Sequence, residues 1–517
     1  MPDNTLSNKR IAKNTLLLYG RMFLIMAVSL FTSRVVLNTL GVEDYGIYNV
    51  VGGVVTMFAF LNGALLTSTQ RYLTFEIGKG DYVQLKRVFT ASIQIHAILS
   101  FFIVLFAETV GLWFFYNKMI IPVERMNAAM WVFQLSLVTL VIQVMSAPYN
   151  SVIIAHERMG VFATISIIEV VSKLLIVYLL LLIGGDKLII YAILIATLQV
   201  VIRIIYTSYC KKHFEETTFT REFNRTLIKE MGQFAGWNII GDLAGTLYRT
   251  GLNLLLNVFF GPVVNAARGI AVQVESATAQ FSTNFLVAVN PQITKLYAQN
   301  NLQEMHKLIF RASKFTCYLL LIISLPVAME TETILTLWLK IVPDYTVQFV
   351  QILLTILIID AMARPLMTAA AATGDVKKYQ TIIGGILLSI VPIAYIVLKM
   401  GGEPISVYFV HLIIYFVAFI VRLVIIRPMI KLSIREFFAS VFLPCGAVSA
   451  LSFIFSYFVK LLFPTDVLSA FCVCVACALI VAIIAYTLGL SKGERAFINS
   501  KLVVVFNKIT HYNKNFK

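Results

Sequence analysis

Long apolar runs separated by short polar breaks dominate the chain. Because a membrane-spanning helix needs about 20 predominantly apolar residues, runs of this length indicate transmembrane helices. Fourteen spans are predicted, at 14–40, 45–70, 88–116, 126–149, 161–183, 188–210, 230–260, 262–294, 308–329, 346–369, 379–399, 405–426, 437–462 and 467–490. The pattern therefore predicts an all-α polytopic membrane protein with little structure outside the membrane.

The two halves of this pattern resemble each other. Gly41 aligns with Gly261 at the turn after the first span of each half, and Pro148 aligns with Pro365 at nearly the same offset. Both alignments relate spans that are six apart. Such spans cross the membrane in the same direction, so the alignments predict a parallel pseudo-repeat. The predicted parts are a six-helix lobe (1–210), a basic cytoplasmic linker (211–229), a second six-helix lobe (230–427), two extra transmembrane helices (437–490) and a basic cytoplasmic tail (491–517).

Composition agrees with a membrane protein. Hydrophobic residues make up 59% of the 517 residues and charged residues only 13%, whereas soluble domains carry about 25% charged residues. The net charge of +16 raises the question of a nucleic-acid partner. If the N-terminus is cytoplasmic, about thirty Lys and Arg residues fall in cytoplasmic segments, among them Arg71, Lys314 and Arg422, and about six fall on the opposite side. The surplus therefore predicts that both termini are cytoplasmic, and no nucleic-acid partner is expected.

Neither a metal site nor an enzyme is indicated. The C-x-C-x-x-C motif at Cys472, Cys474 and Cys477 lies in an apolar span that offers no His or carboxylate to complete a metal site, so we expect structural cysteines there. The chain has no P-loop, no H-E-x-x-H motif and no nucleophile paired with a base. We therefore predict no metal, no cofactor and no catalytic residue.

Charged residues inside spans are costly and usually face a partner or a cavity. Glu169 with Lys173, and Asp360 with Arg364, have the i,i+4 spacing of local ion pairs. Arg203 lies close enough to a span end to reach the interface. These charges are expected to be structural.

The seventh and eighth spans carry polar stripes that local pairing does not explain. Asn238, Asp242, Arg249 and Asn253 follow helical spacing on the seventh span, where Gly241 and Gly245 let another helix approach closely or let the span bend. Arg268 and Glu275 lie on the eighth, with Glu275 at about the depth of Arg249 counted from the shared turn. Arg21 and Arg34 lie on the first span without an acid on that helix. A polar packing seam without a ligand is the alternative interpretation.

If these stripes line a cavity, its surplus of arginines predicts an anionic ligand. The planar guanidinium binds phosphate bidentately, so a diphosphate head group would fit. The candidate substrate-binding residues are Arg21, Arg34, Arg249, Arg268, Asn238 and Asn253.

The stretch from Arg34 to Gly53 (RVVLNTLGVEDYGIYNVVGG), with Gln70-Arg71-Tyr72-Leu73 at the next helix end, resembles the polysaccharide transporter family. This family comprises the Wzx-type flippases of O-antigen and capsule repeat units, and its superfamily also holds lipid II flippases and MATE drug exporters. The resemblance implies transport of undecaprenyl-diphosphate-linked oligosaccharides across the bacterial cytoplasmic (inner) membrane, for lipopolysaccharide or capsule biosynthesis.

The same resemblance implies a mechanism and partners. Alternating access would move the oligosaccharide, with the lipid tail in membrane lipid and arginines such as Arg21, Arg249 and Arg268 holding the diphosphate. Proton or sodium coupling is implied, with Asp242 and Glu275 as the candidate acids. Implied protein partners are a polysaccharide polymerase and chain-length proteins.

Four other functions stay open. A MATE-like cation-coupled drug exporter should have an acidic cavity and confer drug resistance, and a lipid II flippase should be essential. A membrane-embedded glycosyltransferase or polymerase should carry an acidic catalytic motif or a large outer loop, and neither is seen. A scaffold for polysaccharide assembly needs no buried arginines.

Overall fold

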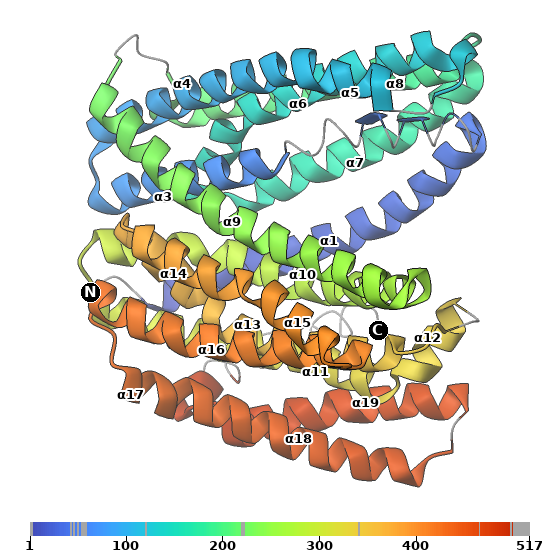
Figure 1. Ribbon diagram of the computed structural model, residues 1–517. Coiled ribbons are helices and arrows are strands. Elements are labelled where there is room, and N and C mark those ends of the chain that lie inside the picture. Colours follow the sequence, from blue (N-terminus) through green and yellow to red (C-terminus); the bar gives the residue numbers. More distant parts are fainter. Residues whose placement is uncertain are drawn as a thin grey trace, which may run out of the picture. The chain divides into compact units, whose positions relative to one another are not determined.

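The structure, a computed structural model, describes residues 4–41, 44, 47–48, 51–52, 59–118, 121–218, 223–339, 342–464, 466–496 and 499. All regular elements within these residues are helical (Figure 1). The predicted all-α polytopic class is confirmed.

Helices of the first half follow one another with short connections. They are α1 (Asn4–Leu40), α3 (Ala59–Lys79), α4 (Tyr82–Phe106), a π-helical turn (Ala107–Gly111), α5 (Leu112–Lys118), a 3-10 turn (Val123–Arg125), α6 (Met126–Ala155), α7 (Met159–Leu182), α8 (Lys187–His213) and a 3-10 turn (Glu215–Thr217). Within this half α6 packs along α8, and α1 along α7.

The second half begins with two very long helices. Its elements are α9 (Arg225–Phe260), α10 (Pro262–Ala298), α11 (Leu302–Met329), α12 (Thr331–Leu339), α13 (Thr346–Thr373), α14 (Lys377–Leu388), α15 (Ile390–Lys399), α16 (Pro404–Ile430), α17 (Ile434–Phe437), α18 (Leu443–Leu462) and α19 (Val467–Ile484), with π-helical turns at Phe438–Phe442 and Ala485–Gly489. Gly261 joins α9 to α10 at a φ of 78°, a left-handed conformation that glycine adopts without strain.

Ten stretches of the described chain are long and apolar enough to cross a membrane. They coincide with ten of the predicted spans. The other four predicted spans fall on α1, α3, α9 and α10, and part of the span at 45–70 lies outside the described residues. Thus the helices that carry most of the intramembrane polar residues are the ones with the weakest apolar signal.

Contacts divide the described residues into two compact units. Unit 1 comprises those within Met1–Leu247, Thr283–Met305 and Met367–Gly385, and unit 2 those within Tyr248–Ser282, His306–Leu366 and Ile386–Lys517. Helices α9, α10, α11, α13 and α14 therefore contribute residues to both units. The predicted pair of six-helix lobes stays a prediction.

Each unit has its own apolar core. In unit 1, helices α3, α4, α6 and α8 and the start of α9 bury a cluster in which Phe89 meets Tyr149 with ring centroids 5.3 Å apart. In unit 2, Phe349 of α13 stacks on Tyr408 of α16 at 4.1 Å. Many large apolar side chains remain exposed, among them Leu182 and Leu462. An exposed apolar surface of this extent suits a lipid environment.

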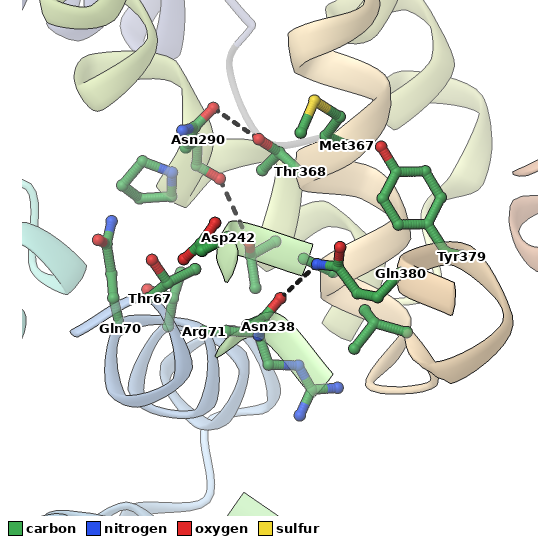
Figure 2. Close-up of a pocket in the computed structure, with 15 residues that line it drawn as sticks. Thr67, Gln70, Arg71, Asn238, Asp242, Asn290, Met367, Thr368, Tyr379 and Gln380 are labelled. Atoms are coloured by element: carbon green, nitrogen blue, oxygen red, sulfur yellow. Dashed lines mark hydrogen bonds between the residues drawn. The ribbon is translucent and has the colours of Figure 1, made fainter. Parts of the chain in front are cut away.

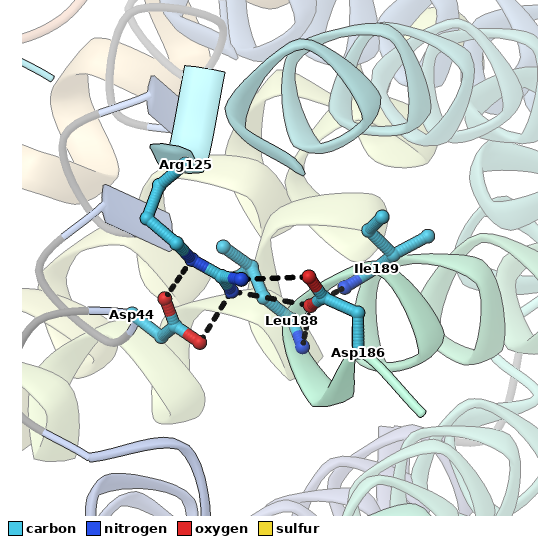
Figure 3. Close-up of polar contacts among 5 residues, drawn as sticks. All are labelled: Asp44, Arg125, Asp186, Leu188 and Ile189. Atoms are coloured by element: carbon cyan, nitrogen blue, oxygen red, sulfur yellow. Dashed lines mark hydrogen bonds and ion pairs between the residues drawn. The ribbon is translucent and has the colours of Figure 1, made fainter. Parts of the chain in front are cut away.

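A charged clamp in unit 1 joins three chain segments (Figure 3). Arg125 donates from Nε and Nη2 to Asp44, at 2.8 and 2.6 Å, and from Nη1 to Asp186 at 2.7 Å. Asp186 also caps α8 by accepting from the backbone amides of Leu188 and Ile189. Burial alone raises the pKa of Asp186, but the hydrogen bonds from Arg125 and the two amides outweigh it and lower that pKa.

Candidate functional site

Unit 1 contains a polar pocket of about 300 Å³ whose lining includes the predicted stripe residues Asn238 and Asp242 of α9 (Figure 2). It is lined by Thr67, Gln70, Arg71 and Thr74 of α3, Asn238 and Asp242 of α9, Asn290, Pro291 and Thr294 of α10, Met367, Thr368 and Ala371 of α13, Val376, and Tyr379 and Gln380 of α14. Amides and hydroxyls predominate, so the site, here called the amide pocket, is polar with little net charge.

Hydrogen bonds between helices order the amides of this pocket. Gln380 donates from Nε2 to Oδ1 of Asn238 at 2.7 Å, and Thr368 donates from Oγ1 to Oδ1 of Asn290 at 2.9 Å. Asn238 in turn donates to the carbonyl of Phe234. The carboxylate of Asp242 forms no ion pair within the described part of the chain.

Arg71 forms one wall of the amide pocket and is held by the chain around it. Its Nη2 donates to the carbonyl of Ala372 at 2.8 Å, and its guanidinium lies 4.5 Å from the ring centroid of Tyr72 and 4.7 Å from that of Phe75. Gly374 makes room for it, because a Cβ at this position would lie 2.8 Å from Nη2.

Sequence reasoning counted Arg71 among the cytoplasmic charges and so missed its place in the pocket. The feature of the sequence that could have revealed this place is the position of Arg71 in the Gln70-Arg71-Tyr72-Leu73 motif.

A second pocket of unit 1, about 550 Å³, shares Arg71 with the amide pocket. Here Lys79 sits 4.5 Å from the ring centroid of Phe75, and Lys377 lies 5.2 Å from that of Trp237. Three basic residues are matched by three acids in the lining, which contains Arg71, Lys79, Lys377, Glu76, Glu230 and Asp375. This pocket therefore has no net preference for either charge.

Unit 2 brings three of the predicted candidates together. Arg249, Arg268 and Glu275 line a chamber of about 70 Å³, here called the arginine chamber. The remaining lining residues are Tyr248, Val272, Leu353, Ile356, Leu357, Asp360, Arg364, His411 and Tyr415. The predicted similar depth of Arg249 and Glu275 agrees with their sharing this chamber.

The arginine chamber is held by a hydrogen-bonded network. Arg268, 6% exposed, donates from Nη2 to the carbonyl of Arg249 at 2.8 Å. Arg249 donates from Nε to the hydroxyl of Tyr248, which lies 2.9 Å from the hydroxyl of Tyr415. His411 is buried against both tyrosine rings, and neither of its ring nitrogens has a hydrogen-bond partner in the part described. Such a buried, unpaired group suits a site that accepts a ligand or water.

Asp360 neutralises part of this positive charge. It accepts from Nε of Arg364 at 3.0 Å, which confirms the predicted local pair, and from Nη1 of Arg422 at 3.3 Å. Sequence reasoning placed Arg422 among the cytoplasmic charges, yet the structure buries it to 4% exposure. Three arginines face two acids in the chamber lining, so the chamber is net cationic.

The other predicted residues lie elsewhere. In unit 1, the guanidinium of Arg21 lies 4.4 Å from the ring centroid of Phe162, away from both the amide pocket and the second pocket. Asn253 is exposed and does not line the chamber of its unit, and the side chain of Arg34 lies outside the described residues. Glu169 and Lys173 form the predicted pair at 2.7 Å.

The cysteine motif shows no metal-site geometry in the described chain. Cys472 is exposed and Cys477 buried, and no group of three or more His, Cys, Asp or Glu residues there is arranged to hold a metal ion.

The architecture is that of a polytopic helical membrane protein. No protein-family model matches the chain, and neither does any curated protein. Among solved structures, an outward-facing multidrug resistance MATE family transporter of the MOP superfamily aligns at a TM-score of 0.68 with 16% identity, covering 81% of this chain and 96% of that one. A MATE structure in the bent conformation aligns at 0.70 with 15% identity, covering 82% of this chain and 96% of that one.

A third similar structure is a MOP superfamily transporter from Pyrococcus furiosus, described as having a binding pocket of reverse polarity. It aligns at a TM-score of 0.68 with 15% identity, covering 81% of this chain and 96% of that chain. At these identities the likeness establishes the fold, which is that of the MATE transporters.

Proposed function

We propose that this protein is a carrier that flips polyprenyl-diphosphate-linked oligosaccharides, of the O-antigen or capsule repeat-unit kind, across the bacterial cytoplasmic membrane. The observation that carries the proposal is the arginine chamber, where Arg249, Arg268 and Arg364 gather in a membrane protein with a MATE fold. The resemblance around Arg34 to Gly53 and Gln70 to Leu73 supports the same substrate class.

The chemistry of the chamber favours an anion. Guanidinium groups bind phosphate oxygens bidentately, and they do so more strongly where water is scarce. His411 adds a buried polar group without a partner among the described residues. At about 70 Å³ the chamber has room for a small group such as water. Binding of a whole diphosphate therefore requires that the chamber widen during the transport cycle.

Pocket charge is a useful discriminator within this fold. The Pyrococcus furiosus transporter is described as having a pocket of reverse polarity that suggests a different function. By the same reasoning, the net positive chamber supports an anionic substrate here. Asp242 and Glu275, neither of which forms an ion pair among the described residues, are the proposed sites of proton or sodium coupling.

The location and partners follow from the same proposal. Both termini would face the cytoplasm, as the distribution of Lys and Arg predicts. A polymerase and chain-length proteins would take the glycan on the outer side.

The test is glycan display in a deletion strain of the native host. Arg268→Ala and Arg249→Ala should each reduce surface polysaccharide at normal expression and cause lipid-linked glycan to accumulate in the inner leaflet. Arg203→Ala is the matched control, because Arg203 is an intramembrane arginine that rests on the Tyr149 ring and lines none of the three pockets described above. Normal display by both chamber variants would refute the proposal.

A MATE-like drug exporter is the second candidate, favoured by the multidrug resistance transporter among the similar structures. The acid Asp242 in the amide pocket is the feature that would suit a cationic drug. Expression in a drug-sensitive strain separates the two. Resistance to cationic dyes that is lost in Asp242→Asn, with no effect of Arg268→Ala, would favour the exporter.

A further inference from the structure

The amide pocket of unit 1 differs chemically from the arginine chamber. Its polar lining comes from five segments and consists mainly of groups that both donate and accept hydrogen bonds: Thr67, Gln70, Thr74, Asn238, Asn290, Thr294, Thr368, Tyr379 and Gln380. Amides and hydroxyls have this dual capacity, whereas arginine only donates and a carboxylate only accepts. The pocket therefore matches a ligand whose own groups both donate and accept.

The two charged residues of the lining do not change this preference. The guanidinium of Arg71 is directed away from Asp242 (Figure 2) and is engaged by the carbonyl of Ala372 and by aromatic rings. The carboxylate of Asp242 points into the amide-rich space, where it can accept from two donors at once.

One glycine makes the arrangement possible. A Cβ on Gly241 would lie 2.0 Å from Oε1 of Gln380, so the amide of Gln380 reaches Asn238 only because residue 241 has no side chain. A Cβ on Gly245, one turn further along α9, would have no heavy atom within 4 Å. The close approach is thus local to the amide pocket, and the chain offers a matched control for it.

We propose that the amide pocket is a recognition site for the uncharged, hydroxylated part of the substrate, namely sugar residues. The proposal rests on the proposed function and deepens it, because it assigns the glycan and the diphosphate to separate sets of residues. Sugar hydroxyls can satisfy the amides of Asn238 and Gln380 and the carboxylate of Asp242. The amides of Asn238 and Gln380 already bond to each other, but a ligand without hydroxyls would leave the carboxylate of Asp242 without a donor, and such a loss is a strong source of rejection. The volume of about 300 Å³ is within the range of small-molecule sites.

The experiment compares two probes on the purified full-length protein in detergent. One probe is undecaprenyl diphosphate, and the other is the lipid-linked oligosaccharide extracted from the host's membranes. Binding of each is measured by microscale thermophoresis for the wild type, Gly241→Ala, Gly245→Ala, Thr368→Val and Arg268→Ala.

The wild type should bind the glycosylated probe more tightly than undecaprenyl diphosphate. Gly241→Ala and Thr368→Val should each reduce that preference about threefold to tenfold, the loss expected for one or two neutral hydrogen bonds. Both should keep the affinity for undecaprenyl diphosphate, and Gly245→Ala should behave as the wild type. Thr368 lies on a different helix from Gly241, so the site is tested even if one variant fails to fold.

Two failures are distinguishable. If the wild type binds neither probe, or Arg268→Ala binds both normally, the proposed function fails. If the wild type prefers the glycosylated probe and both pocket variants keep the full preference, the function stands and the assignment of the amide pocket is overturned. Stabilisation of the protein by sodium alone, lost in Gly241→Ala while the glycan preference stays, would also overturn it and make the pocket a cation site.

Discussion

The clearest energetic consequence of the structure concerns Gly374, which has a φ of 85° and packs against Arg71. We predict that Gly374→Ala destabilises unit 1 through two effects. An alanine in the left-handed region costs about 1–2 kcal/mol. In addition, its Cβ would lie 2.8 Å from Nη2 and 3.2 Å from Cζ of Arg71, too close to be accommodated without moving the guanidinium.

The second effect follows from what Arg71 would lose. A hydrogen bond from a charged donor, such as the 2.8 Å bond to Ala372, contributes about 1.5–3 kcal/mol. The cation–π contacts add about 0.5–2 kcal/mol. Displacement of Arg71 should therefore cost about 2–5 kcal/mol beyond the backbone strain.

Gly80→Ala isolates the strain. Gly80 also ends a helix in the left-handed region, with a φ of 77°, but a Cβ there meets no heavy atom within 4 Å. The assay is thermal unfolding of the purified protein followed by intrinsic fluorescence. At about 2 °C per kcal/mol for a large domain, Gly374→Ala should lower Tm by about 4–10 °C more than Gly80→Ala.

A double-mutant cycle decides whether Arg71 is the cause. In an Arg71→Ala background, Gly374→Ala should cost no more than Gly80→Ala does, because the side chain that clashes is gone. Equal losses from the two glycine substitutions in the wild-type background would refute the reasoning. So would a Gly374→Ala loss that persists in full without Arg71.

Three further predictions concern ion pairs. The pKa of Asp186 is lowered in the folded protein, so its contribution to stability is present above the unfolded pKa of about 3.9 and is lost as the pH falls through the folded pKa. The Tm difference between the wild type and Arg125→Leu should accordingly shrink below about pH 4. A Tm difference independent of pH would contradict this. Asp360→Asn leaves the buried Arg422 without its acid, which should cost about 3–5 kcal/mol, and Arg422→Met in the same chain should recover part of the lost Tm. Glu157 forms an ion pair with Lys295, and the side chain of Glu157 is only 1% exposed. Glu157→Gln should therefore lower Tm to a similar extent. A Tm within error of the wild type would show that this pair is not buried.

The spans were predictable because each depends on a long stretch of local sequence. Apolar runs located ten of the spans on long apolar helices, and the i,i+4 pairs Glu169–Lys173 and Asp360–Arg364 formed as expected because their geometry lies within one helix. Even the aligned glycines Gly41 and Gly261 have the positive φ of turn residues. These features require no knowledge of which helices are neighbours.

The pairs between helices were not predictable for the opposite reason. Lys314, Arg422 and Arg71 lie near span ends, where the positive-inside rule explains a basic residue without any partner. The structure instead pairs Lys314 with Glu494, Arg422 with Asp360 and Arg71 with a backbone carbonyl. Their partners are 62 to 301 residues away in sequence, so no periodicity marks them.

The polar stripe of α9 was predicted to line one cavity, but its residues are divided between two sites. Asn238 and Asp242 line the amide pocket of unit 1, whereas Arg249, seven residues further along the same helix, lines the arginine chamber of unit 2. A substitution that bends α9 would therefore disturb both sites at once. Helices α10 and α13 likewise line both sites, whereas α14 lines the amide pocket and contributes no residue to the arginine chamber. A substitution of Gln380 on α14 therefore gives the cleaner separation of the proposed glycan recognition from anion binding.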